Sequence, residues 1–236
     1  MISVCLTTYN GEKYLLEQLQ SILSQLSQDD EVIISDDGST DKTLEIIEKI
    51  GDRRIRAFKN QQSKGVISNV ENALKQVNGE LIFLADQDDI WLPEKVSICT
   101  TALEQCDLVV SDCFVTDKEL NITHKSFYEL NNSRQNKWKA LIRNPYLGCC
   151  MAFHRKVLHK VLPFPKNIPM HDIWIGNMAA FHFNVKFIPD KLIYYRRHGS
   201  NTSTASEATK AGILKQINYR TSLISSLICV SLNQRK

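Results

Sequence analysis

The chain has 236 residues, of which 43% are hydrophobic and 23% charged, and its formal net charge is +3. These values are typical of a globular chain with a sizeable core, and they exclude collagen-like, low-complexity and broadly disordered proteins. So small a charge is weak evidence for nucleic-acid binding, and we expect no nucleic-acid partner. The seven cysteines are odd in number and form no C-x-x-C pair, which favours a reducing, cytoplasmic setting. No stretch approaches the roughly 18 apolar residues of a membrane-spanning helix.

Apolar strand patterns and amphipathic helix patterns alternate along the first half of the chain. Strands are predicted at 2–8, 31–35, 54–59, 80–85 and 107–113, and again at 147–153 and 185–195. Helices are predicted at 15–26, 41–50, 66–77 and 94–105. Residues 117–145 lose this periodicity and are rich in Asn, Lys and Ser. The pattern indicates one α/β domain with a parallel sheet, crossover helices and a mixed second half.

The C-terminal stretch differs from the rest. Residues 199–210 are predicted as a loop, and residues 211–232 as an amphipathic helix flanked by Lys and Arg. One interpretation packs this helix on the domain or on a second subunit. The other lays residues 211–236 on a membrane surface.

Polar motifs follow the predicted strands at Thr7–Asn10, Asp36–Asp37 and Asp86–Asp89. In a parallel sheet, ligands bind at the carboxyl ends of neighbouring strands, so these segments are expected to converge. Asp86 and Asp88 are spaced as an oxygen-ligand pair for one hard divalent cation, although a turn with helix-capping acids is the alternative. No EF-hand, P-loop, dinucleotide-binding or H-E-x-x-H pattern occurs.

Five motifs together resemble one family. They are TTYNGEKYL, SDDGSTD, LADQDDIW, HDIW and YYRRHGSN, in this order. The combination is similar to the family-2 inverting glycosyltransferases of GT-A fold, and in particular to bacterial enzymes of O-antigen and capsule synthesis, many of them rhamnosyl- or galactosyltransferases.

The resemblance covers residues 1–203 as a GT-A domain, with a Rossmann-like mixed sheet flanked by helices. It implies a nucleotide-binding half at 1–113, an acceptor-binding half at 114–203, and a helical extension at 204–236. The expected partners are a UDP- or dTDP-sugar donor and a glycan or lipid-linked acceptor. The protein would work in the cytoplasm or peripherally at the inner face of the plasma membrane.

The resemblance also implies roles for single residues at the nucleotide. Nucleotide contacts are expected from Thr7, Thr8, Tyr9, Asp37, Lys64, Asn69 and Asp86. The Tyr9 ring would pack on the base, and the Asp37 carboxylate would accept a hydrogen bond from a pyrimidine N3–H, while Asp36 braces the turn. For Lys64 and Asn69, a solvated lysine and a capping asparagine are the alternative.

A metal site is implied nearby. Asp88 would ligate Mn²⁺ or Mg²⁺ beside Asp86, and His198 would complete the metal shell or contact the diphosphate. Of the Arg196–Arg197 pair, one is expected to neutralise the diphosphate and the other to face solvent. Asp89 has an alternative role as the N-cap of the next helix.

The base of an inverting transfer is implied to be Asp172, which would take the proton of the acceptor hydroxyl. Its alternative role is the N-cap of a helix at 173–181. His171 replaces the first acid of the family's E-D pair, so it is expected to affect acceptor contacts, and Trp174 would line the acceptor pocket or belong to the core. Gly148–Met151 matches a strand that floors the acceptor site.

Two other functions compete with glycosyl transfer. A nucleotidyltransferase on a similar fold would need a Gly-rich loop after the first strand, and Thr7–Asn10 is not such a loop. A binding module that has lost its chemistry is disfavoured because Asp86, Asp88 and Asp172 are all present. Cys149 and Cys150 are expected to be packing residues rather than nucleophiles.

Overall fold

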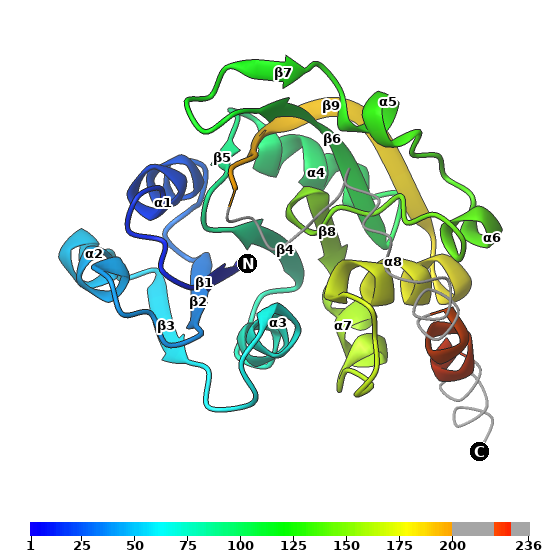
Figure 1. The fold of residues 1–236 in the computed structure, drawn as a ribbon, viewed down its shortest axis with the longest axis horizontal. Coiled ribbons are helices and arrows are strands. Elements are labelled where there is room, and N and C mark those ends of the chain that lie inside the picture. The colour runs from blue at the N-terminus through cyan, green and yellow to red at the C-terminus, as the bar shows by residue number, and fades with distance from the viewer. Residues whose placement is uncertain (200–219, 228–236) are drawn as a thin grey trace.

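The computed structural model describes residues 1–199 and 220–227. Its strands are β1 (Ile2–Thr8), β2 (Glu31–Asp36), β3 (Ile55–Lys59), β4 (Leu81–Asp86), β5 (Ile90–Trp91), β6 (Leu108–Thr116), β7 (Ile122–His124), β8 (Met151–His154) and β9 (Val185–Arg196). They form one sheet in the order β3-β2-β1-β4-β8-β6-β9-β5, with β7 paired to β6 (Figure 1). The predicted mixed α/β sheet is therefore confirmed.

The helices flank this sheet. They are α1 (Leu15–Leu23), α2 (Thr43–Ile50), α3 (Val66–Leu74), α4 (Lys95–Leu103), α5 (Phe127–Asn131), α6 (Lys137–Ala140), α7 (Arg155–Val161) and α8 (His171–His182). Helix α3 packs on β1 and β2, and α8 packs on α7. Figure 1 places α2 and β3 at one end of the molecule, and α6 with the 220–227 helix at the other.

The first half of the sheet is parallel, and its central strands are buried. β3, β2, β1 and β4 lie side by side, and the residues of β1 from Ser3 to Thr8 are all buried. The apolar run of β1 suits this place because a central parallel strand is covered on both faces. The register pairs Thr8 with Asp36 and Thr7 with Asp86, so the predicted convergence of the three polar motifs is confirmed.

The second half of the sheet is mixed. β8 runs antiparallel between β4 and β6, and β9 runs parallel to β6. The strand predicted at 147–153 was wrong in its first half, because Gly148–Cys150 forms a 3₁₀ turn and β8 begins only at Met151. The boundary expected at residue 113 falls inside β6, so the two halves share one sheet.

Residues 220–227 form a helix that packs on the second half. Leu223 and Leu227 are buried, the Arg220 guanidinium donates to the carbonyl of Ile142 at 2.9 Å, and the Ser222 hydroxyl donates to the carbonyl of Asn167 at 2.8 Å. This part of the predicted C-terminal helix is therefore seated on the domain. The remainder of 211–236 and the expected limit at 203 lie outside the described residues. In the described ranges, none of the helices has the length and hydrophobicity to span a bilayer.

Candidate active site

The turn after β2 is built around Asp36. Its Oδ2 accepts hydrogen bonds from the hydroxyls of Thr8 at 2.8 Å and Ser39 at 2.5 Å, and its Oδ1 accepts the backbone N–H groups of Gly38 and Ser39. The prediction that Asp36 braces the turn is confirmed. Because the Thr8 hydroxyl is buried in this network, Thr8 supports the turn with its side chain and does not offer that group to a ligand.

The turn after β1 is locked to the turn after β4 by Gln87. The Gln87 amide accepts from the Tyr9 N–H at 2.9 Å and donates to the Tyr9 carbonyl at 3.0 Å. A Cβ on Gly11 would lie 2.3 Å from Gln87 Oε1, so a larger residue there would displace the Gln87 amide from Tyr9. The Tyr9 ring remains 52% exposed, as a base-stacking role requires. Sequence reasoning missed Gln87, since nothing in a single polar residue between two aspartates marks it as a clamp.

The Asp37 carboxylate holds the loop that precedes α3. Its Oδ1 accepts from the Asn60 side-chain amide and its Oδ2 from the Gly65 N–H, both at 2.8 Å. Lys64 is exposed on this loop, next to Asp37. Asn69 is buried instead: its Oδ1 accepts from a serine hydroxyl of β2 at 2.6 Å and its Nδ2 donates to the Thr8 carbonyl at 3.2 Å. Asn69 therefore supports the loop from behind, in place of the expected contact with the nucleotide.

The carboxyl groups of Asp86, Asp88 and Asp172 lie near one another at the carboxyl end of β4. Burial, followed by repulsion from Asp88 and Asp172, raises the pKa of Asp86 to about 7. Burial likewise raises the pKa of Asp172 to about 6, although hydrogen bonds from the Ile173 N–H and the Asn144 side chain oppose the shift. The acids of β4 and α8 thus lie close enough to repel one another. Keeping three carboxylates together is costly unless a cation or protons compensate them.

Asp88 is paired with His198. The Nε2 atom of His198 lies 2.8 Å from Asp88 Oδ2, and both side chains are only 13% exposed. The imidazole also stacks on Tyr14, with ring centroids 5.1 Å apart. The two residues predicted as metal ligands are therefore neighbours.

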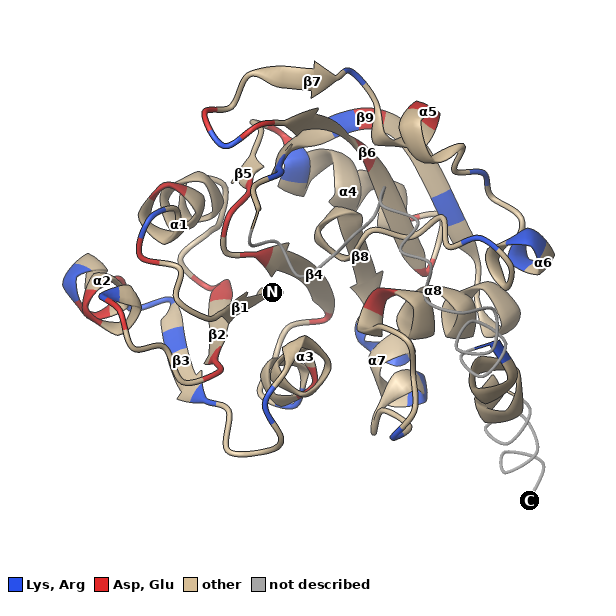
Figure 2. Ribbon diagram, viewed as in Figure 1, with Lys and Arg blue, Asp and Glu red and all other residues tan. Residues whose placement is uncertain are grey.

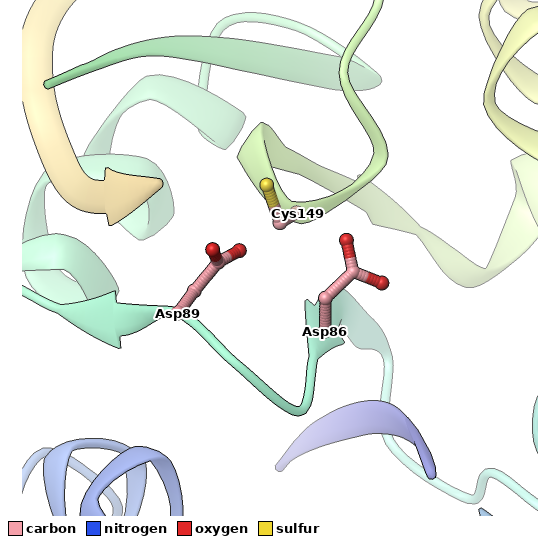
Figure 3. A group of neighbouring side chains, drawn as sticks. All are labelled: Asp86, Asp89 and Cys149. Carbon is pink, nitrogen blue, oxygen red and sulfur yellow. The ribbon is translucent and has the colours of Figure 1, made fainter. Parts of the chain in front are cut away.

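A second cluster of possible metal ligands lies around Asp86 and Asp89. One atom each from Asp86, Asp89 and Cys149 could serve as a ligand, and these atoms all lie within 4.8 Å of one another. Figure 3 shows both carboxylates pointing toward the turn that carries Cys149. Asp89 is fully buried; its Oδ1 accepts from the Arg196 N–H at 3.0 Å, and its Oδ2 has no partner of good geometry among the described residues. Asp89 precedes β5 and α4 begins after Glu94, so its interpretation as a helix N-cap was wrong.

Arg196 stabilises the turn that carries Asp86, Asp88 and Asp89. Its guanidinium donates to the carbonyls of Asp88 at 2.9 Å and Lys118 at 3.0 Å, and to the Glu17 carboxylate at 2.7 Å. The side chain is 4% exposed and lies over the Tyr14 ring. Of the Arg196–Arg197 pair, Arg196 is therefore engaged in holding the turn rather than in neutralising a diphosphate.

The residues expected on the acceptor side of the site, His171, Asp172 and Trp174, lie in the first turns of α8. Asp172 lies in the first turn after the N-cap, Met170, so it is not itself the cap, and its Oδ1 accepts the Ile173 N–H at 2.6 Å. His171 is buried above Gly148, where an added Cβ would lie 2.8 Å from its Nε2, and burial lowers its pKa to about 4. Trp174 is 1% exposed and donates to the Val161 carbonyl at 2.9 Å. It belongs to the core, and the alternative of an acceptor-lining Trp174 was wrong.

The donor set at this site suits a hard divalent cation. Asp86 and Asp88 offer carboxylate oxygens, which Mg²⁺ and Mn²⁺ both accept, and His198 offers an imidazole nitrogen, which Mn²⁺ tolerates better. The raised pKa of Asp86 shows that its ionised form lacks compensating positive charge, and burial with repulsion from Asp88 and Asp86 raises the pKa of Asp89 as well. A cation would remove that cost, so the residues present fit the metal that the motifs predict.

Comparison with known proteins identifies the family to which the chain is similar. Residues 3–162 match the family model described as "Glycosyl transferase family 2". An uncharacterized glycosyltransferase of Nostoc sp. is 28% identical over 224 residues, which cover 88% of this chain and 68% of the relative. The Escherichia coli protein named UDP-Glc:alpha-D-GlcNAc-diphosphoundecaprenol beta-1,3-glucosyltransferase WfgD is 31% identical over 174 residues, which cover 70% of this chain and 64% of the relative.

Two solved structures share the fold. TarS of S. aureus in complex with UDP-GlcNAc has a TM-score of 0.67 at 23% identity, covering 88% of this chain and 61% of that one. Glucosyl-3-phosphoglycerate synthase of Mycobacterium tuberculosis, in complex with Mn²⁺, UDP and phosphoglyceric acid, has a TM-score of 0.63 at 20% identity, covering 98% and 78%. The chain therefore spans about three fifths of the TarS chain. The family model covers more than half of the chain, and the predicted motifs gather at one end of the sheet: the protein belongs to glycosyl transferase family 2 and has the GT-A fold.

Proposed function

We propose that the protein transfers a sugar, with inversion, from a UDP- or dTDP-sugar to a hydroxyl group of a glycan or lipid-linked acceptor in bacterial surface-polysaccharide synthesis. The observation that carries this proposal is the position of Asp172. Its carboxyl group lies at the start of α8, close enough to Asp86 to raise the pKa of that residue, although 86 residues separate them in the chain.

The chemistry assigned to Asp172 is general base catalysis. The acceptor hydroxyl attacks the anomeric carbon, a new carbon–oxygen bond forms as the bond to the diphosphate breaks, and the hydroxyl proton passes to Asp172. A pKa of about 6 suits this role, because the carboxylate is ionised at neutral pH and is a stronger base than a solvated aspartate. One displacement without an enzyme nucleophile inverts the anomeric centre.

The donor would lie over the carboxyl ends of β1, β2 and β4. The exposed Tyr9 ring would pack on the base, and a carboxylate oxygen of Asp37, at the next strand end, would accept the N3–H of uracil or thymine. The asparagine and glycine that bond Asp37 fix its orientation. UDP in the TarS and M. tuberculosis complexes supports the choice of a uridine nucleotide.

Asp86, Asp88 and His198 would hold the divalent cation. When bound, Mn²⁺ or Mg²⁺ supplies charge stabilisation to the leaving diphosphate. The Mn²⁺ in the M. tuberculosis structure supports this assignment. His198 would be positioned for the role by its stacking on Tyr14 and its contact with Asp88.

For the acceptor, the name of the E. coli relative supports a sugar linked to diphosphoundecaprenol. The two rival functions predict different products. A nucleotidyltransferase would release pyrophosphate from UTP and a sugar 1-phosphate, and a binding module would bind the nucleotide without releasing anything.

The test is an assay of the full chain with UDP-Glc, UDP-GlcNAc, UDP-Gal and dTDP-rhamnose, with and without Mn²⁺. A synthetic GlcNAc-diphosphoryl-lipid serves as acceptor. We expect acceptor-dependent release of nucleoside diphosphate and, by NMR, an inverted anomeric centre in the product. A retained anomer, or pyrophosphate as the product from UTP, would overturn the proposal.

A further inference from the structure

The segment between α5 and α8 carries charge of one sign only. No Asp or Glu occurs between Glu129 and Asp172. The cationic residues in this interval are Arg134, Lys137, Lys139, Arg143, Arg155, Lys156, Lys160 and Lys166. Figure 2 shows the blue segments on α6 and α7, at the end of the molecule away from α2. A net charge of +3 for the whole chain is therefore unevenly distributed.

Large apolar side chains are exposed within the same cationic segment. Trp138 and Ile142 are 65% and 68% exposed, the highest values for large hydrophobic residues in the described part of the chain. The Trp138 ring packs at a steep angle against Phe181, with centroids 5.3 Å apart and an interplanar angle of 82°, and the Lys137 Nζ atom lies 5.8 Å from the Trp138 ring centre. The ring is thus held outward by its support rather than left loose. An outward aromatic ring with flanking lysines is the composition that favours the boundary between water and lipid.

A hollow of about 420 Å³ opens beside these residues. Arg134, Lys139 and Arg143 line it, together with the amide side chains of Asn131 and Asn132. Guanidinium and ammonium groups around a small hollow suit a phosphate headgroup.

The same hollow borders the proposed catalytic base. Asn144 forms part of its wall, and a hydrogen bond from the Asn144 side chain is one of the interactions that lower the pKa of Asp172. The cationic surface therefore adjoins the acceptor side of the site.

The C-terminal helix meets this surface. The Arg220 guanidinium donates to the Ile142 carbonyl, and one turn later Ile224 is 40% exposed. Residues 220–227 thus add one cation and one exposed apolar side chain to the surface. We refer to residues 134–143 with Arg220 and Ile224 as the α6 surface.

We infer that the α6 surface docks the protein on an anionic lipid bilayer. The partner is identified by chemistry: cations attract anionic headgroups, and Trp138 with Ile142 can insert at the headgroup level. A second copy of the chain is disfavoured, because a twofold contact through this surface would place like charges face to face. The inference concerns membrane contact and stands apart from the transfer reaction.

The test is sedimentation of the full chain with vesicles, without nucleotide or acceptor, so that it is independent of activity. One vesicle type contains equal phosphatidylglycerol and phosphatidylcholine, and the other phosphatidylcholine alone. We expect binding to the anionic vesicles only, and release by high salt. Replacing Lys137, Lys139 and Arg143 by Gln should weaken binding by about a hundredfold, since each cation near such a surface contributes roughly fivefold.

The matched control removes three cations at the opposite end: Lys42→Gln, Lys49→Gln and Arg53→Gln. It should bind almost as the unmodified chain does. Trp138→Ala tests insertion and should weaken binding while the melting temperature stays unchanged. Equal loss in both triple variants, or no binding by the unmodified chain, would overturn the inference. So would self-association in sedimentation velocity that Trp138→Ala abolishes without any effect on vesicles.

Discussion

The imidazole of His198 lies 2.8 Å from the carboxylate of Asp88, and 110 residues separate the two in the chain. The contact joins the motif after β4 to the residues that follow β9. Arg196 strengthens the junction by donating to the Asp88 carbonyl from the end of β9. The proposed metal site is therefore assembled from both halves of the sheet, and it depends on the antiparallel pairing of β5, which follows the Asp88–Asp89 turn, with β9.

His198→Ala should weaken Mn²⁺ binding in the presence of UDP by about 10- to 100-fold, because the change removes a ligand and leaves Asp88 without its imidazole neighbour. Titration calorimetry of Mn²⁺ into the UDP complex measures the effect. His124→Ala, in the exposed strand β7, is the matched control and should bind Mn²⁺ normally. Unchanged Mn²⁺ affinity in the His198 variant would remove His198 from the metal site.

Asp172→Asn should reduce transfer by roughly 10²- to 10⁴-fold, the usual effect of losing a positioned general base. The Asn side chain can still accept the Ile173 N–H, so the start of α8 should persist and UDP affinity should change little. Steady-state rates and calorimetry separate the two effects. Asp190→Asn, an exposed change in β9, is the control. Turnover equal to that of the unmodified enzyme would exclude Asp172 as the base.

The pH profile of kcat/KM should have an acidic limb set by Asp172. Its pKa is raised to about 6 by burial, and only the ionised carboxylate accepts a proton. The rate should therefore fall about tenfold per pH unit below 6 and level off above about 7. His171, whose pKa is lowered to about 4, stays neutral over this range and should add no second limb. A limb centred near pH 4 would mean that another group is the base.

Asp86 should make the metal-free protein less stable as pH rises from about 4 to about 7. In that window the folded Asp86 carboxyl holds a proton that it loses in the unfolded chain, because its folded pKa is raised to about 7, so its ionisation favours unfolding. The lowered pKa of His171 acts in the opposite direction, so the comparison is made between the unmodified chain and Asp86→Asn. Asp86→Asn should flatten this dependence and raise the free energy of unfolding at pH 8 by about 2 kcal/mol. Thermal melts across pH, with and without Mn²⁺, provide the measurement. An Asp86→Asn variant whose metal-free melting temperature depends on pH as that of the unmodified chain does would contradict the assignment.

Asp37→Ala should weaken UDP binding and reduce the preference for UDP over GDP, because the carboxylate is the expected partner of the pyrimidine N3–H. Competition with a fluorescent nucleotide measures both quantities. Asp29→Ala, an exposed change before β2, is the control. If the preference for UDP survives in the Asp37 variant, the base is recognised by other groups.

Local pattern in the sequence predicted much of the fold. The apolar runs at Ile2–Thr8 and Leu81–Asp86 are buried parallel strands, because a strand covered on both faces cannot alternate with polar residues. The short polar segments at their ends meet at one edge of the sheet because the carboxyl ends of neighbouring parallel strands lie together. Asp36 bracing its own turn was also predictable, since its partners lie within three residues or on the adjoining strand.

Errors arose where distant packing decides the role of a residue. The helical periodicity around Trp174 is the same whether its side chain lines a pocket or packs in the core. The hydrogen bond from its indole N–H to the Val161 carbonyl, at the end of α7, shows that the indole lies in the core. Gly148–Cys150 is apolar enough for a strand, yet it forms a 3₁₀ turn, in which His171 lies so close to Gly148 that an added Cβ would be 2.8 Å from its Nε2. Asn69 is buried because β1 and β2 both bond its amide.

By itself, the sequence determined which side chains are available for chemistry: the aspartates after β2 and β4, Asp172, and His198. Tertiary structure alone decided which of them meet. Asp172 acts on Asp86 because the fold brings the first turn of α8 near the turn after β4, and Asp88 meets His198 because β5, which follows the Asp88–Asp89 turn, pairs with β9. Hydrophobic periodicity shows which face of a segment is buried but not which other segment buries it. The approach of Asp172 to Asp86, across 86 residues, and of His198 to Asp88, across 110, therefore exists only in the folded chain.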